Sequence, residues 1–268
     1  MNPYFHDDVE RWQQNLQQIG GKLLFHGADE WGDILVTGHK RLRVLTFDTV
    51  HEQSCMDLKR PEYLVHEYAR VMMLGLLMTE PDNALLLGLG GGSLVRSLMS
   101  VRPNTSIQVV EIRPKVVDVA REFFGLPDNS ETLNVAIGDA KVWLKHAESS
   151  TFNIVFADLY QAQGISEFQT QARFLKACDR VLTDDGCLVA NFHDIPPYHS
   201  PFFATLNEMF AEIWLCRVDG GNTILFACKQ DVGADLKELL FPNAEALGDA
   251  MGCHLQPAVS RLVRVDMG

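Results

Sequence analysis

The chain has 268 residues, of which 47% are hydrophobic, and these values favour a folded globule with a sizeable core over a disordered chain. Its 35 acidic residues outnumber 23 Lys and Arg, for a net charge of -12, which disfavours nucleic acid as a partner because phosphate backbones are bound by basic side chains. The N-terminus lacks the apolar stretch of a signal peptide and no apolar run approaches the length of a membrane span, so we expect a cytoplasmic protein without a membrane partner.

Cysteine and histidine spacing gives no metal site. The six cysteines contain no Cys-x-x-Cys pair, and most lie inside apolar runs, which is typical of buried thiols in a reducing compartment. The nine histidines show no metal-ligand spacing. We therefore predict no metal.

Residues 1–60 are predicted to form an N-terminal helix and a small β module. A polar helix over 3–19 ends at a Gly-Gly pair, and short β-rich stretches follow, separated by glycines. The predicted strands cover 22–26, 33–37 and 41–47.

Residues 61–81 are predicted to form a connecting helix. Apolar residues recur at helical spacing over 62–79, between Pro61 and Pro81.

From residue 82 to residue 230 the pattern alternates between strands and helices, which predicts an α/β fold with a doubly wound, mostly parallel, seven-stranded sheet. The predicted strands are 84–88, 107–112, 134–137, 153–158, 186–192, 213–218 and 223–229, and the helices are 93–100, 114–124, 139–147, 167–183 and 201–211. A hairpin signal joins the last two strands, which favours a class I methyltransferase-like Rossmann domain over a plain dinucleotide-binding fold. Residues 231–268 are predicted to be a helical tail with a helix over 233–250.

A Gly-rich loop follows the first strand of this domain and opens a helix. Side chains at Gly88, Gly90, Gly91 and Gly92 would block a ligand from backbone N–H groups at the helix N-terminus. A tight turn without a ligand is the alternative.

Acidic residues end the next two strands. Glu111, followed by Ile112, lies about twenty positions after the loop, where a carboxylate can accept hydrogen bonds from both ribose hydroxyls. Asp139, after Gly138, can accept from the exocyclic amine of adenine, cap the following helix, or do both.

A third carboxylate, Asp158, ends the fourth strand, where open α/β sheets place their ligands. Beside the aromatic Tyr160 and partly desolvated, it is a candidate general base for an amine substrate; structural capping is the alternative. His193 and Asp194 follow the fifth strand, and a proline-capped loop is favoured there over a substrate contact.

These residues resemble the spermidine synthase (polyamine aminopropyltransferase) family over about residues 22–230. The features that carry the resemblance are the small β module, Gln53, the His66-Glu67 pair, the Gly-rich loop with Arg96 behind it, Val110-Glu111-Ile112, residues 116–121, Gly138-Asp139 and Asp158. The resemblance implies transfer of an aminopropyl group from decarboxylated S-adenosylmethionine to a small amine, and a homodimer.

The resemblance also implies residue roles. Glu111 would hold the ribose, Asp139 the adenine, and Asp158 would take a proton from the attacking amine. Gln53, Ile112 and the loop glycines belong with the co-substrate, and His66, Glu67, Tyr160 and Gln161 with the amine.

Three positions depart from the family pattern. Gly91 and Gln161 stand where the family has Asp, and Val65 stands where it has Tyr, so groups that grip a cationic amine are absent. Three functions therefore stay open: an aminopropyltransferase-like enzyme, a class I methyltransferase that uses S-adenosylmethionine itself, and a non-catalytic nucleoside-binding homologue.

Overall fold

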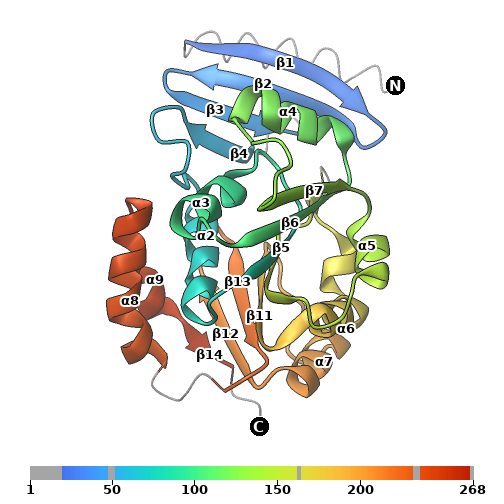
Figure 1. Cartoon of the computed structure of the whole chain (residues 1–268), viewed down its shortest axis with the longest axis vertical. Coiled ribbons are helices and arrows are strands. Elements are labelled where there is room, and N and C mark those ends of the chain that lie inside the picture. The colour runs from blue at the N-terminus through green and yellow to red at the C-terminus, as the bar shows by residue number, and fades with distance from the viewer. Residues whose placement is uncertain (1–19, 48–51, 162–163, 232–235, 266–268) are drawn as a thin grey trace.

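A small antiparallel sheet lies above a large sheet in the computed structural model, which describes residues 20–47, 52–161, 164–231 and 236–265 (Figure 1). The small sheet has the order β1-β2-β3-β4. Its strands are β1 (Gly21–Asp29), β2 (Gly32–His39), β3 (Leu42–Thr46) and β4 (Glu52–Asp57). Three of them were predicted; β4 was not, because its sequence EQSCMD has no run of apolar residues. The predicted helix over 3–19 lies outside the described residues.

The large sheet has eight strands in the order β14-β12-β13-β11-β8-β5-β6-β7. They are β5 (Asn83–Leu87), β6 (Ser106–Glu111), β7 (Leu133–Ile137), β8 (Phe152–Ala157), β11 (Leu182–Phe192), β12 (Glu212–Arg217), β13 (Thr223–Cys228) and β14 (Val263–Arg264). All seven predicted strands are present, and β13 runs antiparallel to both of its neighbours, as the hairpin signal indicated. The eighth strand, β14, extends the edge beyond β12.

The chain order of the strands reverses between β5 and β8. From β5 the chain winds outward through β6 to β7, and then returns to place β8 on the other side of β5. In open α/β sheets a ligand cleft forms at such a switch point, outside the carboxyl ends of the strands.

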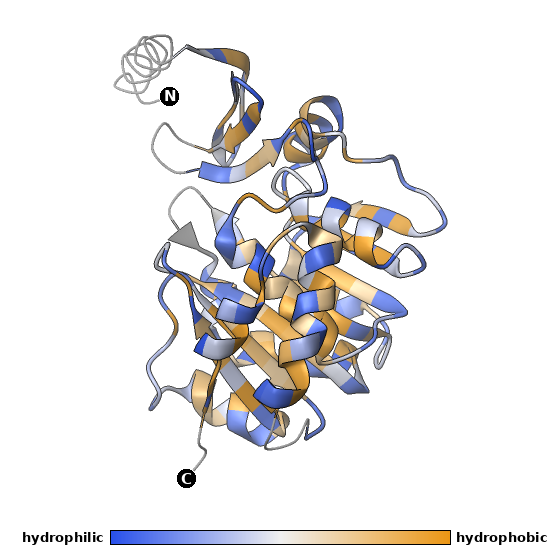
Figure 2. Cartoon of the chain, turned by 90° about the vertical axis from the view of Figure 1, so that its left-hand side faces the viewer, coloured by the Kyte–Doolittle hydropathy of each residue, from blue (hydrophilic) through white to orange (hydrophobic). Residues whose placement is uncertain are grey.

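Helices cover both faces of the large sheet, because side chains alternate along its strands: Leu85 and Leu87 point to one core and Leu86 to the other. The Leu86 face is covered by α2 (Glu67–Met72), the 3-10 helix η1 (Met73–Leu77), α3 (Ser93–Val101), α8 (Leu236–Met251) and α9 (Gln256–Arg261). The opposite face is covered by α5 (Ala140–His146), α6 (Ala172–Val181) and α7 (Pro201–Met209). Figure 2 shows hydrophobic strands in the middle of these layers.

The helix predicted over 62–79 is shorter than expected. It begins at Glu67 as α2 and continues as η1 to Leu77. The guanidinium of Arg70 donates to the carbonyls of Leu64 and Val65, each at 2.8 Å, and so satisfies backbone groups just before α2 without helical bonds.

Other boundaries also differ. The helix predicted over 167–183 is divided into the 3-10 turn η2 (Glu167–Thr170) and α6, because the Gln169 side chain turns inward and bonds to backbone beside two strand ends. A short pair, β9 (Tyr160–Gln161) and β10 (Gly164–Ile165), precedes it. The tail adds α9 and β14 to its one predicted helix, and both pack on the large sheet.

Helix α4 (Pro114–Phe124) joins the two sheets. Val116, Val119 and Phe124 pack on the small sheet, whereas Val117 and Ala120 belong to the large core. The small sheet therefore shares buried surface with the α/β domain through this helix.

No helix in the described ranges is long and apolar enough to cross a bilayer. All six cysteines are free thiols; five are buried, as predicted, and Cys253 is half-buried.

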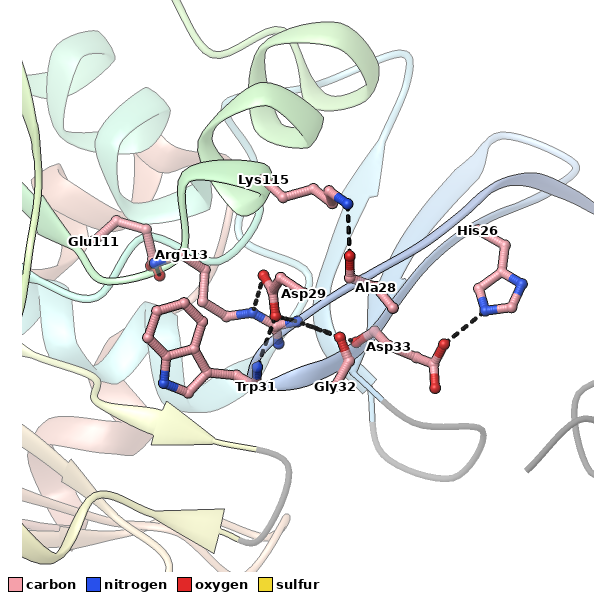
Figure 3. Close-up of polar contacts among 9 residues, drawn as sticks. All are labelled: His26, Ala28, Asp29, Trp31, Gly32, Asp33, Glu111, Arg113 and Lys115. Atoms are coloured by element: carbon pink, nitrogen blue, oxygen red, sulfur yellow. Dashed lines mark hydrogen bonds and ion pairs between the residues drawn. The ribbon is translucent and has the colours of Figure 1, made fainter. Parts of the chain in front are cut away.

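An ion pair fastens the β1–β2 turn to the large sheet (Figure 3). Arg113, just after β6, contacts both carboxylate oxygens of Asp29, at 2.7 and 2.9 Å, and also donates to the carbonyl of Gly32 at 2.8 Å. The guanidinium carbon lies 4.5 Å from the ring centroid of Phe47. The Asp29 carboxylate also accepts from the backbone N–H of Trp31 at 3.0 Å, so the turn is held in one conformation.

Removing this arginine should loosen the small sheet. The Arg113 side chain is 5% exposed and that of Asp29 is 16% exposed, so Arg113→Ala leaves a largely buried carboxylate without its cation and should cost about 3–5 kcal/mol of unfolding free energy. Urea unfolding monitored by tryptophan fluorescence would measure it. The matched control is Arg121→Ala, whose partner Asp128 is 92% exposed and where little change is expected. Equal effects of the two variants would contradict this account.

Candidate active site

A cavity of about 980 Å³ opens at the switch point, between the carboxyl ends of the large sheet and the small sheet. Most of the predicted site residues line it: Gln53, His66, Gly88, Gly90, Glu111, Ile112, Gly138, Asp139, Asp158 and Tyr160. His193 and Asp194 line it as well. Gln161 belongs to β9, and its side chain lies outside the described part of the structure.

The Gly-rich loop needs glycine at Gly88 because two strands approach closely there. Gly88 has a φ of 94°, and a Cβ at this position would lie 2.4 Å from the backbone oxygen of Asp158. The backbone N–H of Asp158 in turn donates to Leu87 at 2.9 Å. The loop after β5 and the chain after β8 are thus in direct backbone contact at the floor of the cavity.

Gly91 and Gly92, at the end of the loop that enters α3, do not line the cavity. The N–H of Gly91 donates to Ser54 Oγ at 2.8 Å, and a Cβ on Gly91 would lie 3.0 Å from both Ser54 Cβ and Phe124 Cδ1. A Cβ on Gly92 would meet Leu126 and Arg96. The position where the family has Asp therefore points toward β4 and α4.

Glu111 is fixed by backbone donors. Its carboxylate is buried and accepts from the N–H of Leu89 at 3.0 Å and from the N–H of Arg113 at 2.9 Å. Burial raises the pKa of this carboxyl, and the backbone donors partly offset the rise. Since one donor comes from the Gly-rich loop, Glu111 also ties that loop to β6.

Asp139 caps α5. Its carboxylate accepts from the N–H of Lys141 at 2.7 Å, and both residues line the cavity. The capping interpretation of Asp139 is confirmed, and contact with an adenine stays a prediction.

Asp158 receives two hydrogen bonds. Asn191 Nδ2 donates to its Oδ1 at 2.8 Å, and the Tyr68 hydroxyl also hydrogen-bonds to the carboxylate. Burial raises the pKa of Asp158, and these two donors partly offset the rise because they favour the ionised form. The result is an oriented carboxylate in the cavity with a higher than ordinary proton affinity.

A chain of amide side chains holds Asn191. Its Oδ1 accepts from Asn222 at 2.9 Å, and its backbone oxygen accepts from Gln169 Nε2 at 2.7 Å. Gln169 Oε1 accepts from the N–H of Leu159 at 3.0 Å, and Asn222 reaches the hydroxyl of Tyr160 at 3.4 Å. The ends of β8 and β11 and the turn before β13 are therefore cross-linked around Asp158.

His66 and Glu67 have different surroundings although they are neighbours. His66 Nε2 lies 3.4 Å from a carboxylate oxygen of Glu52 without forming a hydrogen bond, and burial lowers the pKa of His66. Glu67 turns away from the cavity, where it pairs with Arg261 of α9 and accepts from the N–H of Asp219 at 3.2 Å. Glu67 thus joins α2 to the β12–β13 turn.

Sequence reasoning missed Tyr68, Ser54, Gln169, Asn222 and the role of Asn191. Only Asn191 carried a usable signal, because it is a polar residue in the otherwise apolar run Cys187–Phe192. Among the described residues, no group of three His, Cys, Asp or Glu side chains is placed to hold a metal ion.

Adding a methyl group at Gly88 should disrupt the cavity floor. Gly88→Ala forces a Cβ against the Asp158 carbonyl at a positive φ, and should cost about 2 kcal/mol or more in urea unfolding. Gly138→Ala is the control, because a Cβ there meets no atom within 4 Å. If both variants unfold at the same urea concentration, the close approach at Gly88 is not a constraint.

The sequence of the chain is similar to those of known proteins. Residues 63–214 match the model of the spermine/spermidine synthase domain. A polyamine aminopropyltransferase of Chromobacterium violaceum is 29% identical over 233 residues, which cover 86% of this chain and 89% of that protein.

Two solved structures show the same fold. The crystal structure of a probable spermidine synthase from Corynebacterium glutamicum has a TM-score of 0.71 at 18% identity and covers 90% of each chain. Human methyltransferase-like protein 13 in complex with SAH has a TM-score of 0.59 at 22% identity and covers 70% of this chain and 93% of its own. With a family model matching more than half of its length, the chain belongs to the spermine/spermidine synthase family.

Proposed function

We propose that the protein transfers an aminopropyl group from decarboxylated S-adenosylmethionine to a small amine. The observation that carries this proposal is Asp158: a buried, doubly hydrogen-bonded carboxylate in the same cavity as the Gly-rich loop and Glu111. Membership of the family and the aminopropyltransferase name of the relative support it.

The nucleoside end of the cavity fits the co-substrate. A Cβ at Gly88 would collide with the backbone of Asp158 and one at Gly90 with Ser54, so both glycines let the loop pack closely against its neighbours along the cavity. The Glu111 carboxylate accepts from the backbone N–H groups of Leu89 and Arg113 and interacts with that of Ile112, which leaves an acceptor position for a ribose hydroxyl, since a carboxylate has about four. Ile112, Gly138 and Asp139 would surround the adenine, and Gln53 would face the sulfonium side.

The reaction needs one proton acceptor. The nitrogen of a neutral amine attacks the propyl carbon bonded to sulfur, the carbon–nitrogen bond forms, and the carbon–sulfur bond breaks with its electron pair left on sulfur. Neutral methylthioadenosine results. The product nitrogen or its ammonium precursor gives up a proton to Asp158, whose raised pKa makes it a better base than an ordinary Asp.

The structure offers less support for a methyltransferase that uses intact S-adenosylmethionine. That alternative needs room for a carboxylate near Gly91, but Ser54 and Phe124 occupy this direction. Among the described cavity-lining residues the permanent cations are Arg113 and Lys141, and Arg113 is already paired with Asp29. Arg96, behind the Gly-rich loop, does not line the cavity and already donates to the carbonyls of Pro61 and Gly91.

The decisive experiment is an assay with purified protein, decarboxylated S-adenosylmethionine and a panel of di- and polyamines. We expect methylthioadenosine with at least one acceptor, detected by chromatography, and its loss in Asp158→Asn. Methyl transfer from S-adenosylmethionine, or ligand binding without turnover for any acceptor, would instead favour one of the other two functions.

The pH profile tests how Asn191 acts on Asp158. Asn191→Leu removes a hydrogen bond to the ionised carboxylate, worth about 1.5–3 kcal/mol, so the acid limb of kcat/KM should move up by roughly one to two pH units. The sign follows because the ionised form loses its donor and protonation becomes easier. Asn243→Leu, on an exposed position of α8, is the control. An unmoved acid limb in Asn191→Leu would show that Asn191 only stabilises the fold.

Two further properties are part of the proposal. The buried thiols support a reducing, cytoplasmic location. A homodimer, which the family resemblance implies, remains a prediction.

A further inference from the structure

The proposed reaction requires the cavity to bind ammonium groups. The two positions where the family has Asp carry no negative charge in this chain. Gly91 has no side chain, and a Cβ there would point toward Ser54 and Phe124. Gln161 has an uncharged amide. Another carboxylate on the cavity wall would have to replace them.

Glu52 is such a carboxylate. It is the first residue of β4, it lines the cavity, and its side chain is 45% exposed there. The next residue, Gln53, has its backbone oxygen 4.0 Å from where a Cβ of Gly90 would lie, so the start of β4 runs beside the Gly-rich loop. Glu52 therefore stands on the wall that faces the bound co-substrate.

Two described groups lie against the Glu52 carboxylate. His66 Nε2 lies 3.4 Å away, but burial lowers the pKa of this imidazole and favours its neutral form. Cys55 bonds to the carboxylate as a thiol, because burial, together with the charge of Glu52, raises the pKa of Cys55. Neither group is a permanent cation.

Glu52 is also electrostatically close to the proposed base. The hydroxyl of Tyr68 bonds to Asp158 and lies within the field of both Asp158 and Glu52. Both charges thus act on one tyrosine, and the reaction needs two anions: Asp158 receives the proton of the reacting nitrogen, and a second nitrogen that stays protonated needs a fixed negative charge.

We propose that Glu52 binds a primary ammonium group of the substrates and so takes over the task of the acidic residue absent at Gly91. This inference rests on the proposed aminopropyl transfer. The ammonium has two sources, the propyl ammonium of the donor and the distal ammonium of the acceptor, which the experiment separates.

The test compares Glu52→Gln with Glu52→Asp, which keeps the charge, and with Glu62→Gln, an exposed carboxylate on the segment before α2. Isothermal titration with decarboxylated S-adenosylmethionine and with methylthioadenosine, which lacks the ammonium, forms the first arm. Steady-state kinetics with the acceptor varied at saturating donor forms the second.

We expect Glu52→Gln to weaken one ammonium-bearing substrate roughly ten- to hundred-fold, with Glu52→Asp recovering part of the loss and Glu62→Gln unchanged. Weaker binding of the decarboxylated donor with unchanged methylthioadenosine binding assigns Glu52 to the donor. A raised KM for the acceptor with unchanged donor binding assigns it to the acceptor.

The inference is overturned if Glu52→Gln is folded and active and neither substrate is affected. Failure of the proposed function looks different, because the wild-type protein would then form no methylthioadenosine with any amine. In that case titration decides alone: the inference is refuted if Glu52→Gln changes neither the preference for the decarboxylated donor over methylthioadenosine nor the affinity for any amine of the panel.

Discussion

The backbone contact between the loop after β5 and the chain after β8 is the constraint on which the site depends. At Gly88 the two strands that diverge at the switch point come so close that only a hydrogen fits between them. This contact places the Gly-rich loop and Asp158 side by side, and the bonds from Leu89 to Glu111 and from Asn191 to Asp158 extend the same arrangement to β6 and β11. These residues of the cavity are therefore positioned by the ends of regular strands, which hold a site more precisely than free loops do.

The two ends of the cavity are built differently. At the proposed nucleoside end, Glu111 and Asp139 are held by backbone N–H groups, so their geometry follows from the main chain. At the proposed amine end, Asp158 depends on side chains, Asn191 and Tyr68, and the support continues through further amides to Gln169. Such side-chain networks change with single substitutions, which agrees with an amine end that departs from the family pattern while the nucleoside end keeps it.

Much of the α/β domain was predictable because its signals are local. Buried strands such as 84–88 read as apolar runs, the helices between them show regular spacing, and the Gly-rich loop marks one strand end. Strand β4 and the pair β9–β10 were not predictable in this way, since β4 has no run of apolar residues and β9 and β10 have two residues each. The same limit applies to β14, which is only two residues long.

The directions of individual side chains in the site were harder to predict from the sequence than the position of the site. The family resemblance grouped Glu67 with His66 at the amine, but α2 begins only at Glu67, and the Glu67 side chain pairs with Arg261, which is 194 residues away in the chain. Tyr68, which reaches Asp158, had no motif of its own. Contacts of this kind depend on tertiary packing, which a single sequence does not reveal.

The side chains around Gly91 limit which substitutions the Gly-rich loop can accept. An aspartate at position 91 would have to fit between Ser54 of β4 and the fully buried Phe124 of α4, and Gly91 already donates its N–H to Ser54. A single substitution would therefore press its Cβ against both side chains, which would have to shift to admit it. Changes at position 91 are thus coupled to the small sheet and to α4, and a loop grafted from a relative is best combined with β4 from the same donor.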